Sequence, residues 1–303
     1  MKIAAVVVTY NRIDLLKECI NALEEQKVEC DILIVNNNSD DGTREWIKEY
    51  MRDHKNVFCH SLKKNTGGAG GFNHGMKWAV QAGYDYVWIM DDDCIVKEDS
   101  LEKLLEADKL LGGPENYGFL SSVVLWTDGK ECIMNRQKIV KSFYRHVELM
   151  KHGIVQIQQA TFVSLLFPKE TILKFGLPIK EYFIWGDDIE YTRRIALRGK
   201  TESYLVGQSE VVHKMKENSG SDIATDDISR LDRYRLAYRN ESYTYRKQGI
   251  VGICLYLARC ARGFIRILIH GNGHRLKRMC VLIKGVISGL AFCPKIERIN
   301  NSN

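Results

Sequence analysis

Residues 86–93 read YVWIMDDD, an apolar run of strand-forming side chains that ends in three adjacent carboxylates. Upstream, residues 3–9 (IAAVVVT) form another continuous apolar run, as expected of a strand buried on both faces of a sheet. Up to about residue 125, such runs alternate with segments of helical periodicity. This alternation predicts an α/β fold with a mostly parallel central sheet and flanking helices.

The same patterns predict the remaining elements. Further strands are expected at residues 31–35, 57–62, 119–125, 156–167 and 203–206. Helices are expected at residues 15–23, 44–51, 72–82, 100–111, 169–175 and 190–197. From about residue 220 onward the pattern is helical, so we expect a main domain over residues 1–218 and a helical C-terminal extension over residues 219–303.

The charge of the chain is unevenly distributed. The net charge is +6, yet residues 242–296 contain ten Lys or Arg and no Asp or Glu. Without that segment the remainder has a charge of +6 − 10 = −4. The sequence therefore predicts a mildly acidic body with a strongly basic tail.

Cysteine usage and hydropathy indicate the compartment. The nine cysteines include no C-x-x-C pair, which favours reduced thiols in the cytoplasm. The N-terminal apolar run is too short for a secretory leader, and no stretch reaches the roughly 18 apolar residues of a membrane-spanning helix. We expect a cytoplasmic protein.

Four polar segments follow predicted strands. They are residues 9–11 (TYN), 36–41 (NNNSDD), 65–71 (NTGGAGG) and 91–93 (DDD). In open α/β sheets ligands bind at the carboxyl ends of the strands. Each segment alone fits ordinary loop chemistry, but their convergence on one sheet edge predicts a ligand site.

The acidic run has two interpretations. Adjacent carboxylates repel one another, and a hard cation such as Mg²⁺ or Mn²⁺ relieves that repulsion. In this spacing Asp91 and Asp93 project to the same side and can hold one metal. The alternative is a solvated acidic turn that caps the helix near Ser100.

Residues 185–190 (WGDDIE) place three more acids before a predicted helix. They could merely stabilise the helix N-terminus. Alternatively, Asp188 is a general base, and Trp185 and Tyr182 offer apolar faces to a sugar ring. A lone histidine such as His213 is usually structural, and it becomes a metal ligand only if the sheet returns it to Asp93.

The glycine-rich segment excludes two nucleotide-binding motifs. It lacks the Gly-Lys-Ser/Thr of a P-loop, and it departs from the G-x-G-x-x-G of dinucleotide enzymes. It still allows a bulky group to approach the backbone, with free N–H groups at a helix start.

Taken together, these motifs resemble the family 2 glycosyltransferases of the GT-A fold. The matching pieces are VVVTYNR at 6–12, IVNNNSDDGT at 34–43, NTGGAGGFNHG at 65–75, MDDD at 90–93 and WGDDIEY at 185–191. Within the family the set looks most like bacterial galactofuranosyltransferases, and rhamnosyltransferases are close relatives. The resemblance assigns the GT-A catalytic domain to residues 1–218.

The resemblance implies a role for each matching residue. Family members usually carry an Asp early in the turn where Asn36 and Asn37 stand. The implied donor-binding residues are Thr9, Tyr10, Asn11, Asn36, Asn38, Asn65, Gly67, Gly68, Gly70, Gly71, Asp91 and Asp92. The implied metal ligands, for Mn²⁺ or Mg²⁺, are Asp91, Asp93 and His213. The acceptor site would comprise Tyr182, Trp185, Gly186, Asp187 and Glu190, with Asp188 as catalytic base.

The implied reaction is an inverting, metal-dependent transfer from a UDP-sugar, best matched by UDP-galactofuranose, to a glycan or lipid-linked glycan in cell-surface polysaccharide synthesis. A dTDP-rhamnose-dependent rhamnosyltransferase is the nearest alternative. From other classes, a nucleotidyltransferase would share the metal and the sheet. A basic nucleic-acid-binding protein would share the cationic tail, but no reader motif is present and no nucleic-acid partner is expected.

The basic tail combines cationic and apolar stripes at helical spacing. Arg259, Arg262 and Arg266 share one stripe, and apolar residues lie beside them. Such helices suit an anionic membrane surface, which predicts peripheral contact with the inner face of the cell membrane. The alternative is packing on the catalytic domain or on a second subunit of a homo-oligomer.

Overall fold

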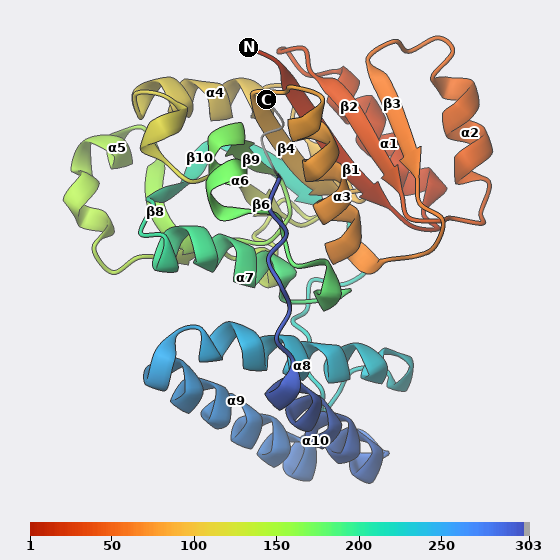
Figure 1. Ribbon diagram of the computed structural model, residues 1–303, viewed down its shortest axis with the longest axis vertical. Coiled ribbons are helices and arrows are strands. Elements are labelled where there is room, and N and C mark those ends of the chain that lie inside the picture. The colour runs from red at the N-terminus through yellow and green to blue at the C-terminus, as the bar shows by residue number, and fades with distance from the viewer. Residues whose placement is uncertain (300–303) are drawn as a thin grey trace.

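The computed structural model describes residues 1–299, and a sheet of ten strands forms its core (Figure 1). The strands follow the order β3-β2-β1-β4-β9-β6-β10-β8-β7, and β5 pairs with β10 off this path. The first four are parallel: β1 (Ile3–Thr9), β2 (Asp31–Asn36), β3 (Val57–Ser61) and β4 (Tyr86–Asp91). Their carboxyl ends therefore meet at one edge, as the sequence predicts.

Helices cover both faces of this parallel part. Alternate residues of β1 point to opposite faces, which explains its continuous apolar run. Val7 packs in the core that includes residues of α1 (Ile13–Glu24) and α4 (Ser100–Leu110), whereas Val6 packs in the core of α3 (Gly67–Gln81). The shorter helix α2 (Thr43–Tyr50) buries Ile47 in the first of these cores.

The second half of the sheet mixes directions. β9 (Leu165–Pro168) runs antiparallel to β4 and to β6 (Leu120–Leu125), and β6 runs parallel to β10 (Ser203–His213). β8 (Ile154–Gln159) pairs with β10 and with the two-residue β7 (Lys138–Ile139), and the helix α5 (Val147–Lys151) precedes it.

One short pairing matters for the site. β5 (Cys94–Val96) is antiparallel to the end of β10, with His213 opposite Cys94. The sheet thus returns His213 to the turn that carries Asp92 and Asp93.

Three predicted elements differ from the structure. The strand predicted at 156–167 is two strands, β8 and β9, separated by residues 160–164, where Ser164 has a φ of 55°. The strand predicted at 203–206 continues to His213 through a register shift between Val206 and Glu210. The segment predicted as a glycine-rich turn forms the first turns of α3, because its glycines allow that helix to lie close to β1.

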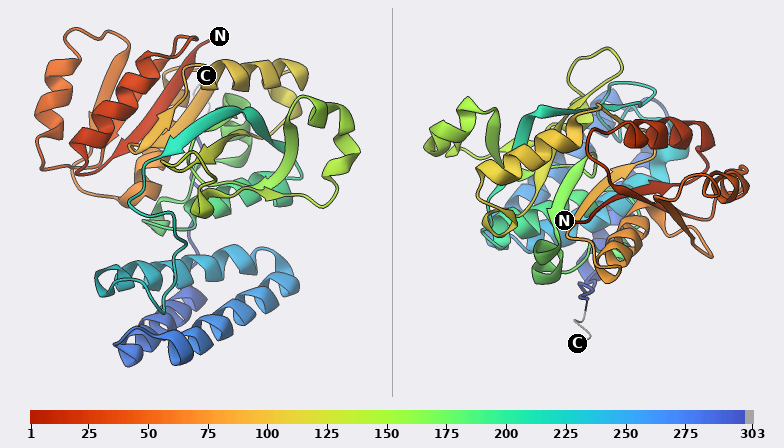
Figure 2. Two further views of the ribbon diagram at one scale, coloured as in Figure 1. Left: turned by 180° about the vertical axis from the view of Figure 1, so that it is seen from behind. Right: turned by 90° about the horizontal axis from the view of Figure 1, so that it is seen from above.

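Further helices precede and follow β10. α6 (Lys169–Phe175) follows β9, and α7 (Asp187–Arg193) continues as a π-helical turn over Arg194–Arg198. The predicted C-terminal helices are α8 (Leu231–Arg246), α9 (Gly249–His270) and α10 (Arg275–Ala291). Figure 1 and the left view of Figure 2 show α8 between the sheet-containing part and the other two helices.

The segment after α10 returns to the sheet-containing part (Figure 1). The backbone oxygen of Glu297 accepts a hydrogen bond from Leu177 N at 2.9 Å. Its carboxylate lies 2.8 Å from both Lys77 Nζ and Lys180 Nζ. Within residues 1–299, no helix has the length and apolarity needed to cross a membrane.

Candidate active site

The three aspartates lie at the carboxyl end of β4, in contact with the loop after β1. Thr9 Oγ1 donates a hydrogen bond to Asp92 Oδ2 at 2.7 Å. Arg12 Nη1 lies 3.1 Å from Asp92 Oδ1 and 2.6 Å from Asp93 Oδ2. The residue before α4 is Asp99, which makes no side-chain capping hydrogen bond. Asp92 and Asp93 are therefore buried and held by these contacts, whereas Asp91 is partly exposed, so the run as a whole is not a solvated cap.

Burial and mutual repulsion shift the acidity of these carboxyls. Burial, followed by the charges of Asp93 and Asp92, raises the pKa of Asp91 to about 8. Burial raises the pKa of Asp92 to about 6 despite the nearby Arg12. Burial would also raise the pKa of Asp93, but the hydrogen bond from His213 and the charges of His213 and Arg12 outweigh it and lower that pKa. Ionisation of Asp91 as well would place three carboxylates beside the two positive groups Arg12 and His213, and a bound cation would offset that excess negative charge.

His213 completes this cluster. Its Nε2 lies 3.1 Å from Asp93 Oδ1, and its Nδ1 lies 2.8 Å from Asn135 Oδ1. Burial lowers the pKa of His213, but its hydrogen bonds to Asp93 and Cys132 and the charges of the aspartates raise it to about 10. One ligand atom from each of Asp93, Cys94 and His213 lies within 4.8 Å of the others.

These donors fit a hard divalent cation. Carboxylate oxygens suit Mg²⁺ and Mn²⁺, and an imidazole is compatible with Mn²⁺. Burial raises the pKa of the Cys94 thiol well above its ordinary range, which makes Cys94 a poor ligand for such an ion. Of the predicted ligands, Asp93 and His213 belong to this group, whereas Asp91 is not one of its three members, although its charge acts on His213. No local sequence pattern predicts the contact of His213 with Asn135.

The loops after β1 and β2 are tied together. Asn11 N donates to Ser39 Oγ at 3.0 Å, and Asp40 N donates to Asn11 Oδ1 at 2.9 Å. Tyr10 is 44% exposed, and Asn38 is exposed with a φ of 64°. Tyr10 and Asn38 are therefore accessible to a ligand.

Asn36 does not make the contact with the nucleotide-sugar donor that the sequence predicts. It is fully buried, its Oδ1 accepts from Ser39 N at 2.9 Å, and its Nδ2 donates to Ser61 Oγ at 3.3 Å. Both ends of the carboxamide thus hold the loop, and the side chain is not free to bind a base in this conformation. Its neighbour Asn37, also buried, accepts from Thr66 N at 2.8 Å and donates to Gly67 O at 2.9 Å.

The glycines at the start of α3 serve different purposes. A Cβ on Gly67 would lie 1.9 Å from Phe183 O, and a Cβ on Gly71 would lie 2.4 Å from Val8 Cγ1. A Cβ on Gly70 would likewise lie 2.4 Å from Thr66 Oγ1. A Cβ on Gly68 would meet no atom within 4 Å, so Gly68 is the member of this group that faces open space. Asn65 Oδ1 accepts from Gly67 N at 2.7 Å and fixes the entry to the helix.

The segment predicted to bind the acceptor lies between α3 and α8. Ala69 N donates to Phe183 O at 3.2 Å, which joins this segment to the glycine-rich start of α3. The indole of Trp185 is partly exposed, packs edge-on against Tyr234 with ring centroids 5.0 Å apart, and lies under the guanidinium of Arg230.

Asp187 and Asp188 form the first turn of α7 after Gly186, which has a φ of 88°. Burial raises the pKa of Asp188 to about 6, although Ile189 N hydrogen-bonds its Oδ1 at 2.7 Å. Burial and the charge of Asp188 raise the pKa of Asp187 well above its ordinary range, and Asp91 adds to that shift. The acids of α7 and of β4 are therefore close enough to interact.

Comparison with known proteins identifies the family. The family model "Glycosyl transferase family 2" matches residues 4–110. The undecaprenyl-phosphate mannosyltransferase of Micrococcus luteus is 32% identical over 206 residues, which cover 66% of this chain and 80% of that protein. This chain belongs to glycosyl transferase family 2. The predicted family and activity class are thereby confirmed.

This glycosyltransferase is similar to other glycosyltransferases along most of its length. Galactofuranosyltransferase GlfT1 of Mycolicibacterium smegmatis is 24% identical over 271 residues, which cover 82% of this chain and 84% of that protein. The structure of GalNAc-T7 with UDP, GalNAc and Mn²⁺ superposes with a TM-score of 0.60 at 14% identity, over 78% of this chain and 48% of that one. That of S. aureus TarS 1–349 with UDP-GlcNAc gives 0.53 at 16% identity, over 96% and 73%. These likenesses confirm the GT-A fold.

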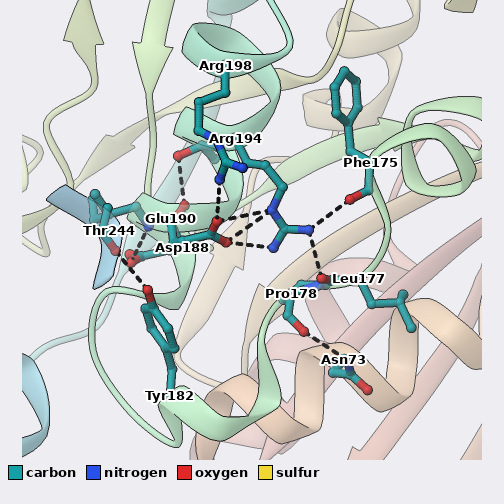
Figure 3. Close-up of polar contacts among 12 residues, drawn as sticks. Asn73, Phe175, Leu177, Pro178, Tyr182, Asp188, Glu190, Arg194, Arg198 and Thr244 are labelled. Carbon is teal, nitrogen blue, oxygen red and sulfur yellow. Dashed lines mark hydrogen bonds and ion pairs between the residues drawn. The ribbon is translucent and has the colours of Figure 1, made fainter. Parts of the chain in front are cut away.

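Three residues predicted to contact the acceptor are buried, namely Tyr182, Asp187 and Glu190, and Figure 3 shows the polar contacts of Tyr182 and Glu190. Glu190 is 2% exposed, and its carboxylate pairs with Arg194, with Oε2 2.6 Å from Nη2. Tyr182 is fully buried, and its hydroxyl lies 2.8 Å from Thr244 Oγ1. Neither side chain can reach a sugar in this conformation. Both support the segment that precedes the predicted base Asp188.

Proposed function

We propose that this glycosyltransferase binds a divalent cation through Asp91, Asp93 and His213 and transfers galactofuranose from UDP-galactofuranose with inversion. The observation that carries the metal site is the position of His213 Nε2, 3.1 Å from Asp93 Oδ1, beside an Asp91 whose pKa is raised to about 8. Mn²⁺ and UDP in the structure of GalNAc-T7 support the same pairing of metal and nucleotide. The similarity to GlfT1 supports the sugar.

In the proposed reaction Asp188 acts as general base. Its carboxylate accepts the proton of an acceptor hydroxyl while that oxygen forms a bond to the anomeric carbon, and the bond from that carbon to the diphosphate breaks. A pKa of about 6 suits a base that is ionised near neutral pH. The cation, when bound, would offset the negative charge on the departing diphosphate.

The chain's own residues would position the donor. Tyr10 and Asn38 are accessible beside the buried Thr9, and Gly68 leaves room for the backbone to approach the diphosphate. The guanidinium of Arg12 is 48% exposed and offers a further positive charge at the same edge. Trp185 is partly exposed and would offer an aromatic face to the acceptor.

A donor screen tests the sugar and the metal together. Thermal shift and product formation would be measured with UDP-galactofuranose, UDP-galactopyranose, dTDP-rhamnose and a mannose nucleotide, each with and without Mn²⁺. We expect Mn²⁺-dependent stabilisation and turnover with UDP-galactofuranose. Preference for dTDP-rhamnose would identify a rhamnosyltransferase. Nucleotide-sugar binding that is the same with and without Mn²⁺ would contradict the metal site.

A substitution tests the base. Asp188→Asn should abolish transfer while Mn²⁺-dependent donor binding stays within about threefold, because the base contributes to the transition state and not to ground-state binding. Retained turnover in this variant would refute the role of Asp188.

The C-terminal helices would hold the enzyme at the inner membrane surface, near a lipid-linked acceptor. Large apolar side chains of α9 and α10 face solvent, including Ile250 at 81%, Leu276 at 80% and Leu290 at 65% exposed. Basic residues accompany them, and residues 242–296 carry no acid. Sedimentation with anionic vesicles at low salt should capture the protein, and Ile250→Glu/Leu276→Glu should release it. A wild-type protein that stays unbound but forms dimers would instead identify the face as a subunit interface.

A further inference from the structure

The segment that leads into α7 holds an unusual backbone conformation. Phe183 and Trp185 have φ values of 64° and 65°, and Gly186 has a φ of 88°. For residues with a side chain, this left-handed region is strained and persists only where the surroundings impose it. The proposed base Asp188 follows directly, so whatever imposes this conformation also places its carboxylate.

Asn240 of α8 faces this segment. It is fully buried, and its Nδ2 lies 3.0 Å from Tyr182 O, 3.1 Å from Ile184 O and 2.9 Å from Trp185 O. The two N–H groups of the Asn240 carboxamide are therefore shared among three carbonyl oxygens, all of which face Asn240 on α8. The carboxamide can therefore bind all three carbonyl groups only when the segment follows this backbone path.

A second residue fixes the orientation of that carboxamide. Asn240 Oδ1 accepts from Arg239 Nε at 3.0 Å and from Arg239 Nη2 at 2.8 Å. Arg239 Nη2 also lies 2.7 Å from Glu181 O, one residue before the segment. With Oδ1 bound to a guanidinium, Nδ2 must point toward the carbonyl groups.

We propose that Asn240 is a positioning residue that sets the path of residues 182–186 and thereby aims Asp188 at the acceptor. The inference rests on the proposed role of Asp188 as base. It also makes α8 a part of the active-site framework: the same helix buries Tyr238 among the C-terminal helices and presents Asn240 to the catalytic segment.

Asparagine is the residue that this position requires. Leucine has nearly the same shape but would leave the carbonyl groups of Ile184 and Trp185 without this donor, and Tyr182 O would keep only its bonds from Ile184 N and Arg239 Nη2. Aspartate would set a carboxylate against those carbonyl groups. Serine keeps one hydroxyl donor on a shorter side chain, so it removes the match to the three carbonyl groups without placing an apolar side chain against them.

The test compares Asn240→Leu and Asn240→Ser with Arg235→Gln, a substitution of an exposed residue on the same helix. We expect both Asn240 variants to lose about 10²-fold in kcat while the Kd for UDP-galactofuranose with Mn²⁺ stays within threefold, because misplacing a reacting group by about 1 Å costs this much. Amide hydrogen exchange at residues 183–189 should rise by at least tenfold. Arg235→Gln should change none of these.

A folded Asn240→Ser enzyme with wild-type kcat and exchange would overturn the proposal, as would an equal loss of donor binding. If Asn240→Leu does not fold, Asn240→Ser decides by the same measurements. If both fail to fold, Asn240 supports the whole fold and the proposal is refuted. Failure of the base assignment gives another result. Asp188→Asn would then retain turnover, whereas amide exchange at residues 183–189 would still rise in the Asn240 variants.

Discussion

Replacing Glu190 by glutamine removes one charge from a buried ion pair and tests which role Glu190 has. Glu190 and Arg194 side chains are 2% and 4% exposed. Arg194 Nη1 also donates to Phe175 O at 2.8 Å and to Leu177 O at 3.1 Å, so the pair joins α7 to the chain after α6 (Figure 3). Arg198 Nη1 lies 3.4 Å from the same carboxylate and is partly exposed.

The cost of the substitution follows from this burial. Breaking a buried pair costs about 3–5 kcal/mol because one charge is left uncompensated. Glutamine retains an acceptor for Arg194, which favours the lower end of that range. With an unfolding entropy of about 2.1 cal/mol/K per residue, a chain of this length loses about 1 °C in Tm for each 0.6 kcal/mol. We therefore expect Glu190→Gln to lower Tm by about 5 °C.

Thermal unfolding and acceptor kinetics measure the two possible roles separately. Glu190→Leu combined with Arg194→Met should recover part of the lost Tm, since apolar side chains of similar volume can replace a buried pair. Glu131→Gln is the control, because its pair with Arg136 is about 60% exposed and should be worth less than about 1 kcal/mol. An unchanged Tm in Glu190→Gln with a raised KM for the acceptor would refute this reasoning and restore the predicted sugar contact.

Three further predictions concern the catalytic centre. As pH falls through about 6, Asp188 gains a proton, so log(kcat/KM) should decline with a slope of 1 below that value; a flat profile from pH 5 to 8 would contradict a base at Asp188. Mn²⁺ at 100 times its Kd should stabilise the enzyme by about 2.7 kcal/mol, and EDTA should reverse the effect; Asp93→Asn should lose this response, as followed by Tm. Gly68→Ala should fold normally but weaken donor binding, because its Cβ enters open space, whereas Gly71→Ala should lower Tm by pressing on Val8; the opposite pattern, read by calorimetry, would place the donor elsewhere.

The parallel half of the sheet could be predicted because its signals are local. β1, β2 and β4 are short apolar runs between amphipathic helices, and polar residues follow each of them. Parallel strands bring their carboxyl ends to one edge, so the sequence could place Thr9 and Asp92 at the same edge. Their contact at 2.7 Å also depends on the pairing of β1 with β4. Local pattern and global fold agree in this region.

The errors arose where tertiary contacts decide. Glycines have low helix propensity, so the segment around Gly70 looks like a turn, yet close packing against the rest of the chain makes it helical. The roles of Asn37, Asn135 and Asn240 depend on partners 29 to 78 residues away in sequence, and an asparagine carries no local mark of such contacts. The burial of Glu190 was missed because its partner Arg194, four residues on, reads equally well as an exposed helical pair.

The segment after α10 that carries Glu297 has a consequence for biosynthesis. A chain emerging from the ribosome presents the parallel half of the sheet first. The supports of residues 177–186 come much later, from Asn240 and finally from Glu297, which binds Leu177 and two lysines. The segment before Asp188 therefore gains these supports only after residues 240 and 297 have been made and have folded against it.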